Sequence, residues 1–110
     1  MAAKFNIKKA KNGQFMFNLK ASNGEIILTS EMYTTKSSLM NGIKSVKVNA
    51  KAKKNFKTLT AKNNKPYFVL RAGNNQVIGT SEMYSSTSAL ENGIDSVKKN
   101  APGAKIDDQS

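Results

Sequence analysis

The residues of this sequence best suited to chemistry are two glutamates in a motif that occurs twice. Ser30-Glu31-Met32-Tyr33 recurs 51 residues later as Ser81-Glu82-Met83-Tyr84. Two carboxylates related by a repeat could act as general acid and general base, or could bind a cation. In the structural interpretation, each glutamate stabilises the positive end of a following helix, while the tyrosines fill the corner between strand and helix. We favour the structural interpretation for Glu31, Tyr33, Glu82 and Tyr84.

The sequence contains no histidine and no cysteine. Disulfides, thiol nucleophiles, imidazole bases and metal sites built from cysteine or histidine are therefore excluded. No glycine-rich phosphate loop is recognisable. We predict a protein that is not an enzyme and that has no catalytic, cofactor-binding or metal-binding residues. An enzyme that uses Glu31 and Glu82 is kept as an alternative.

The charge of the chain is strongly positive. Eighteen lysines and arginines against seven acidic residues give a net charge of +11, which attracts polyanions. Arg71 is the one arginine, and lysine lacks the planar fork with which arginine binds phosphates and guanine edges. Weak non-specific nucleic-acid or polyanion binding is thus one hypothesis. The other is that the lysines only keep the protein in solution.

The sequence consists of two copies of one unit. At an offset of 51 residues without gaps, Phe17 aligns with Phe68, and Asn41-Gly42-Ile43 aligns with Asn92-Gly93-Ile94, which indicates a tandem duplication. We predict one domain, residues 1–110, made of two repeats. It divides into repeat 1 (residues 1–50), a lysine-rich connector running into the fourth strand (51–57), repeat 2 (55–101) and a C-terminal tail (102–110).

Each repeat begins with a pattern typical of three strands. Residues 15–21 place apolar side chains at every second position, as a half-buried strand does. A strand around Phe5 and Ile7 precedes it, and Asn12-Gly13 suits the tight hairpin turn between them. Residues 25–29 form the third strand, and Asn63-Asn64 takes the hairpin position in repeat 2.

The end of each repeat has the spacing of an amphipathic helix, with apolar residues at i, i+4, i+7 and i+11. Thr35 and Ser86 are suited to cap the two helices at their N-termini. Gly42 and Gly93 lie inside these helices, where glycine costs about 1 kcal/mol relative to alanine. We therefore predict that the sheet or the other helix packs closely against both glycines. The apolar stripes comprise Leu39, Ile43, Val46, Ala50, Leu90, Ile94, Val97 and Ala101.

The two repeats are predicted to share one core, because a unit of about 50 residues buries too little apolar surface to fold well alone. We expect an α+β fold, in which tandem β(3)-α repeats form one mainly antiparallel six-stranded sheet with both helices packed on one face. The sheet contributes Phe17, Leu19, Ile27, Phe68, Leu70 and Ile78 to the core beneath the helices.

These elements resemble the YegP-like family of small tandem-repeat proteins. The likeness is carried by residues 18–24, 30–33, 41–47 and 49–50, together with their partners in the second copy. It implies a β(3)-α unit present twice, with helices exchanged between the repeats. It brings no catalytic residues, because the family has no settled activity. The second copy departs from the first where Asn75 replaces Gly24 and Pro66 replaces Phe15, which affects its turn and the start of its strand.

The sheet face turned away from the helices is the candidate interaction surface. It mixes cations with moderately apolar groups, although an antiparallel face of this kind is commonly just solvated. Tyr67 is its one aromatic residue, so nucleic-acid bases would find little to stack on. We hypothesise a non-enzymatic interaction module that uses this face and whose partner is unknown. The residues of the face are Lys4, Asn6, Lys8, Met16, Asn18, Lys20, Lys57, Tyr67, Val69 and Arg71.

Expectations for location and assembly follow from the same patterns. No apolar run approaches the ~18 to 20 residues of a membrane span, and the first residues lack the features of a signal peptide. We expect a cytoplasmic protein without membrane contact. The repeats should pair within one chain, which gives a monomer with internal pseudo-twofold symmetry, and a fragment of residues 1–51 is expected to dimerise.

Overall fold

The computed structural model describes residues 3–110. Each repeat forms three strands followed by a helix, and the C-terminal segment adds a further strand. Two short 3-10 turns, Lys53–Asn55 and Ala101–Gly103, follow the helices. The other elements are β1 (Lys4–Lys9), β2 (Phe15–Lys20), β3 (Ile26–Ser30), α1 (Lys36–Asn49), β4 (Phe56–Thr60), β5 (Pro66–Arg71), β6 (Val77–Thr80), α2 (Thr87–Asn100) and β7 (Lys105–Asp108).

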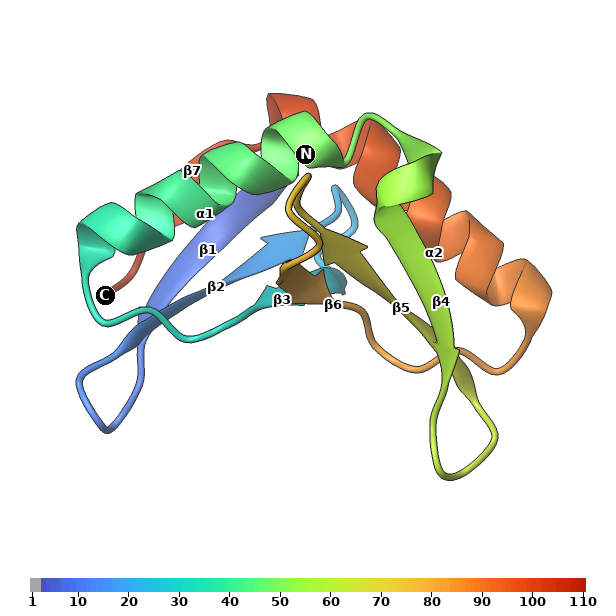
Figure 1. The fold of residues 1–110 in the computed structure, drawn as a ribbon. Coiled ribbons are helices and arrows are strands. Elements are labelled where there is room, and N and C mark those ends of the chain that lie inside the picture. Colours follow the sequence, from blue (N-terminus) through green and yellow to red (C-terminus); the bar gives the residue numbers. More distant parts are fainter. Residues whose placement is uncertain (1–2) are drawn as a thin grey trace.

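The strands form one sheet in the order β4-β5-β6-β3-β2-β1-β7. The two repeats meet where β3 pairs with β6 in antiparallel orientation, and Thr29 lies opposite Thr80. These two residues are 51 positions apart and therefore equivalent, so a pseudo-twofold axis passes between them. Figure 1 shows both helices on one side of the sheet, while the β1–β2 and β4–β5 hairpin loops project away from them. The predicted α+β architecture is confirmed.

The number of strands differs from the prediction, because the expected C-terminal tail contains a strand. This strand, β7, pairs in parallel with β1 and makes the sheet seven-stranded and mixed. It escapes pattern analysis because it contains a single apolar residue, and aspartate is rare in strands. Tertiary contacts hold it instead: Asp107 pairs with Lys4 at 3.4 Å, and Asp108 pairs with Lys36 at 2.8 Å.

The hairpin turns and helix starts are found where the sequence predicts them. Gly13 and Asn64 adopt positive φ angles of 84° and 66° at the tips of the β1–β2 and β4–β5 hairpins. The hydroxyl of Thr35 accepts a hydrogen bond from the backbone N–H of Ser38 at 3.1 Å, at the start of α1. Ser86 caps α2 in the same way at 3.1 Å. Local chemistry therefore sets these boundaries independently in each repeat.

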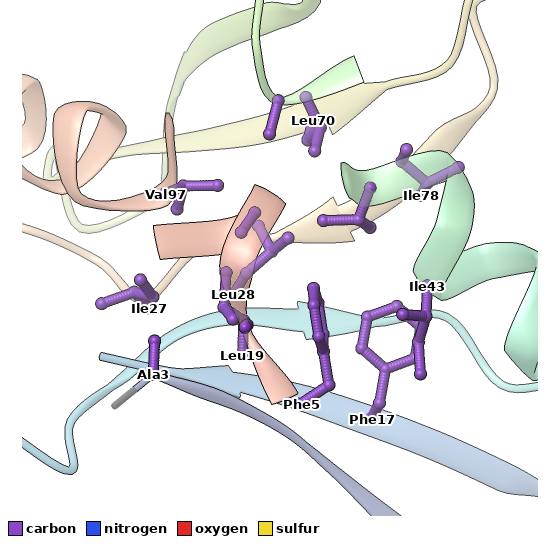
Figure 2. Packing of buried hydrophobic residues seen from close by; sticks show 14 of the residues in the cluster. Ala3, Phe5, Phe17, Leu19, Ile27, Leu28, Ile43, Leu70, Ile78 and Val97 are labelled. Carbon is purple, nitrogen blue, oxygen red and sulfur yellow. The ribbon is translucent and has the colours of Figure 1, made fainter. Parts of the chain in front are cut away.

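The core lies between the sheet and the two helices, and both repeats contribute to it. The predicted apolar stripes of α1 and α2 are buried, and Figure 2 shows sheet and helix side chains of both repeats meeting in one cluster. Helix α1 contacts β2, β5 and β6, and α2 contacts β3 and β5. Each helix therefore bridges the two repeats, whereas a simple exchange would place it on the other repeat alone.

The repeats differ where they meet in the core. Leu28 of β3 is fully buried, whereas its equivalent in β6 is Gly79. A Cβ atom on Gly79 would lie 2.6 Å from Cδ2 of Leu28, so the glycine makes room for the leucine. Register shifts at equivalent points of the β2–β3 and β5–β6 ladders let Ile27 and Ile78 reach the same core.

Candidate functional site

The repeated Ser-Glu-Met-Tyr motif lies where each repeat leaves its third strand. The hydroxyl of Ser30 accepts a hydrogen bond from the backbone N–H of Phe17 at 2.9 Å and donates one to the carbonyl oxygen of Glu31 at 2.8 Å. Ser81 makes the same pair of bonds in repeat 2, at 2.9 and 2.7 Å. The serine side chain takes the place of a strand carbonyl, so the backbone can turn towards the helix without leaving a buried N–H unpaired.

The tyrosine of the motif explains the glycine inside the helix. The ring of Tyr33 stacks on Phe17 with centroids 6.3 Å apart, and its hydroxyl end lies against Gly42 of α1. A Cβ atom at Gly42 would lie 2.7 Å from Cζ of Tyr33, and one at Gly93 would lie 2.5 Å from Cζ of Tyr84. The predicted close packing at both glycines is confirmed. The neighbour, however, is the tyrosine of the same repeat and not the sheet or the other helix.

Glu31 and Glu82 are exposed, and the fold does not bring them together. Because β3 and β6 are antiparallel, the residues that follow them leave the shared ladder at opposite ends. Each carboxylate lies instead near its own tyrosine: burial raises the pKa of Tyr33 and Tyr84, and Glu31 and Glu82 raise it further. The alternative of a catalytic carboxylate pair therefore has no geometric support.

Two other classes of site are not found in the part of the chain that the structure describes. No group of three or more acidic, histidine or cysteine side chains there is positioned to hold a metal ion. No helix in residues 3–110 is long and apolar enough to cross a membrane. The remaining candidate is the sheet face turned away from the helices, called the open face from here on.

The strand register places the predicted interaction residues on the open face. A row of directly paired residues crosses it from Asn6 through Asn18, Thr29 and Thr80 to Val69. Nδ2 of Asn18 donates a hydrogen bond to Oγ1 of Thr29 at 3.0 Å. Asn6, Asn18 and Val69 are buried, with exposed fractions of 2%, 4% and 7%, although the strand alternation predicts them to be exposed. Each lies between two longer side chains on the same face of its own strand.

The open face carries six cations and one carboxylate among its strand residues. The carboxylate, Asp107, is already paired with Lys4 at 3.4 Å. Lys105 escapes sequence analysis because it belongs to β7. The cations are Lys4, Lys8, Lys20, Lys57, Arg71 and Lys105. On the open face, Lys8, Lys57 and Lys105 are exposed. The half-buried members are Lys4, Met16, Lys20, Tyr67 and Arg71.

A hollow of about 470 Å³ lies at the β4–β5 hairpin, next to Tyr67 of the open face. Met83 lines it and is 55% exposed. The side-chain nitrogen of Asn63 lies 3.7 Å from the sulfur of Met83. This hollow leaves no signal in the sequence, where Met83 stands out only as part of the repeated motif. The remaining lining residues are Thr60, Ala61 and Lys62.

Comparison with known families gives a match on both repeats. The model of a domain of unknown function, DUF1508, matches residues 10–56 and again residues 61–108, which confirms the tandem duplication. A UPF0339 protein of Shewanella oneidensis is 53% identical over 108 residues, 98% of each chain. The UPF0339 protein YegP of Yersinia pestis is 57% identical over 104 residues, 94% of this chain and 93% of that protein.

Two solution NMR structures have the same fold. The structure of UPF0339 protein SO3888 from Shewanella oneidensis has a TM-score of 0.91 at 53% identity and covers 98% of this chain and 92% of that one. The structure of yegP from E. coli, described as a protein of unknown function, has a TM-score of 0.93 at 46% identity and covers 99% and 94%. Neither description names an activity.

Proposed function

We propose that this chain, which belongs to the DUF1508 family of UPF0339 (YegP-like) proteins, is a non-enzymatic interaction module. The open face is its binding surface, and its partner is a protein with an acidic surface. One observation carries the proposal: the open face has six cations and a single, already paired carboxylate, while both helices cover the opposite face. Complementary charge of this kind speeds association and selects the partner.

The hollow at the β4–β5 hairpin supports the proposal, because it offers an anchor for one apolar side chain. Tyr67 and Met83 line it. Tyrosine is enriched at the energetically important positions of interfaces, and the flexible methionine side chain adapts to the shape of a partner. A cationic face with a small apolar depression fits an acidic protein surface that carries an apolar residue better than it fits a bare polyanion.

Weak non-specific nucleic-acid binding is the second candidate, because the net charge of the chain is +11. Two features of the open face count against it. Tyr67 is the one aromatic side chain on its described strands, whereas single-strand platforms stack several bases on several aromatic rings. The Nε atom of Arg71 is buried, so Arg71 cannot present its full donor fork to a phosphate.

The test compares charge reversal on the two faces of the molecule. In the variant Lys8→Glu/Lys57→Glu, both substitutions lie at exposed positions of the open face. In the matched control Lys44→Glu/Lys99→Glu, both lie at exposed positions of the helices, so the net charge changes equally. The probes are polyglutamate and single-stranded DNA of equal charge, each at low and high salt. Amide chemical shifts record where each probe binds.

We expect polyglutamate to shift the amides of the open face. Its affinity should fall by about tenfold in the open-face variant and much less in the helix control. Equal losses in the two variants, or shifts confined to the helices, would contradict the proposal. Tighter binding of DNA than of polyglutamate at the open face would favour the second candidate. Affinity capture from a native lysate, with and without nuclease, then identifies the partner.

A further inference from the structure

The two outer edges of the sheet end differently. β1 is the outer strand of repeat 1, and β7 pairs along it. The equivalent strand of repeat 2, β4, pairs with β5 on one side and ends the described sheet on the other, as Figure 1 shows. Repeat 2 therefore has an unpaired strand edge at the position that β7 occupies in repeat 1.

The shared register shows which backbone groups this edge offers. The β4–β5 pairing is the β1–β2 pairing shifted by 51 residues. In repeat 1, the carbonyls of Ala3 and Ile7 accept hydrogen bonds from the N–H groups of Lys105 and Gln109, at 3.2 and 2.9 Å. Thr58 is the equivalent of Ile7, so its N–H and carbonyl point outwards from β4. An incoming strand can bond to them as β7 does to β1.

The side chains of β4 suit an edge that stands uncovered and binds reversibly. Lys57, Thr58 and Thr60 are exposed, and polar or cationic side chains protect a bare edge from aggregation. Lys54 lies two residues before the strand, in the 3-10 turn Lys53–Asn55. The charge around this edge therefore favours an acidic strand over a basic or neutral one.

The register of β7 shows where a carboxylate would be recognised. On β1, Asp107 lies directly opposite Asn6. The equivalent of Asn6 on β4 is Lys57. An aspartate or glutamate that pairs with β4 in the same register would thus lie opposite a lysine. At this position, the charge pairing on β4 would be more favourable than the pairing of Asp107 with Asn6 on β1.

We propose that the β4 edge binds an extended, acidic segment of a partner protein by strand addition, in the parallel orientation that β7 adopts on β1. Backbone hydrogen bonds to Thr58 supply affinity, and Lys57 selects a carboxylate. This inference concerns the edge of the sheet and rests on strand pairing, so it holds or fails separately from binding at the open face.

The test uses the full chain and a synthetic peptide of its own residues 104–110 as the probe. Covalent attachment keeps β7 on β1 at an effective concentration of about millimolar, so the added peptide should occupy β4 instead. We expect the amide of Thr58 to shift and to exchange more slowly with solvent as peptide is added, whereas the N–H of Phe56 already bonds the carbonyl of Lys53. The amides of Phe5 and Ile7, already paired with β7, should not change.

Backbone methylation of the peptide provides a matched control that leaves the protein untouched. The N–H groups of Lys105 and Gln109 face β1, so that of Asp107 faces the same way and that of Asp108 faces away. N-methylation at Asp107 should weaken binding by about tenfold or more, and N-methylation at Asp108 should change it little. In the protein, Lys57→Glu should weaken binding severalfold, whereas Lys99→Glu should not.

Three results would overturn the proposal. The first is a peptide that shifts no β4 amide at millimolar concentration. The second is binding that responds equally to methylation at Asp107 and at Asp108, because the contact would then not be a strand ladder. The third is slow exchange at Thr58 without peptide in a protein that self-associates, because a second copy of the chain would then cover the edge. Open-face binding is read from other amides, so either proposal can fail alone.

Discussion

Repeat 1 and repeat 2 share a strand register and helix caps, yet their outer strands lie in different environments. Phe5 and Ile7 of β1 are completely buried, whereas Phe56 of β4 is half-buried and Thr58 is exposed. The difference comes from β7, which lies outside both predicted repeats. A duplicated sequence therefore folds alike locally, but its burial depends on what the rest of the chain places beside it.

A second difference lies at the start of the middle strand. Phe15 exchanges two backbone hydrogen bonds with Tyr33, at 2.7 and 2.8 Å. Its equivalent, Pro66, has no N–H and keeps one bond, donated by the N–H of Tyr84 at 2.8 Å. Repeat 2 is thus less firmly held at this corner as well as at its outer edge.

The largest effect should be equal in the two repeats, because Phe17 and Phe68 have equivalent environments. Each is fully buried and meets the phenylalanine of the neighbouring outer strand edge-on. Replacing either with alanine should lower the free energy of unfolding by about 3 to 5 kcal/mol, as measured by denaturant titration. Values that differ by more than ~1 kcal/mol would show that the repeats differ in the core as well as at the edges.

The lysines of the open face provide the control for this comparison. Lys20→Ala and Lys57→Ala should each change the free energy of unfolding by less than about 0.5 kcal/mol, because both side chains reach solvent. If they cost as much as the phenylalanine substitutions, the assignment of the open face is wrong.

The next largest effect should differ between the repeats, because it concerns the phenylalanines of the outer strands β1 and β4. Phe5 is fully buried beside β7, and Phe56 is half-buried at the bare edge. We expect Phe5→Ala to cost about 3 to 5 kcal/mol and Phe56→Ala about 1 to 2 kcal/mol, in the same titration. Equal costs would mean that β7 contributes little to the burial of Phe5.

Removing residues 105–110 should make the two edges alike. Without β7, the side chains of Phe5 and Ile7 become partly exposed, and the free energy of unfolding should fall by about 2 kcal/mol. Hydrogen exchange offers the sharper measurement: the amides of Phe5 and Ile7 should then exchange as fast as that of Thr58. Continued protection of the β1 amides would contradict the role given to β7.

The smallest effect should be a pH dependence confined to the β7 edge. Hydrogen bonds from Lys36 and Ser110 hold the pKa of Asp108 well below its usual range. This carboxylate therefore stabilises the folded state above its unfolded pKa of about 3.9 and loses that contribution as the pH falls below it. Between pH 6 and pH 3, the melting temperature of Asp108→Asn should fall slightly less than that of the parent, by a margin that salt reduces.

Much of the fold could be predicted because its signals are local. Alternation marks the central strands, helical spacing marks the buried stripes, and Thr35 and Ser86 mark the helix starts. β7 could not be predicted in this way, because one isoleucine among charged residues has no strand pattern and its partner strand lies about a hundred residues away in the chain. Long-range pairing of this kind leaves no periodicity to detect.

The sequence predicts which side chains lie on the open face, but it does not predict how exposed each one is or where the face is hollowed. Alternation places Asn18 and Val69 on the open face, yet both are buried. Alternation also cannot reveal the hollow beside Tyr67, which forms where a hairpin and the chain after β6 meet. The contact between Tyr33 and Gly42 was predictable in part. A glycine inside a helix indicates close packing, but the residue that packs there, Tyr33, lies nine positions earlier and outside the helix.

The packing of Leu28 against Gly79 has consequences for the evolution of a tandem repeat from single units. It also bears on the stability of a dimer formed by one repeat alone. In a symmetric pair of single units, the two residues facing each other across the axis must be identical, so leucine would meet leucine or glycine would meet glycine. One arrangement overfills the space, and the other leaves a void. Joining the units in one chain removes this restriction, because each copy can then change alone. In a dimer of residues 1–51, Leu28 of one copy would pack against Leu28 of the other. This dimer should be less stable than a dimer of the same fragment carrying Leu28→Ala.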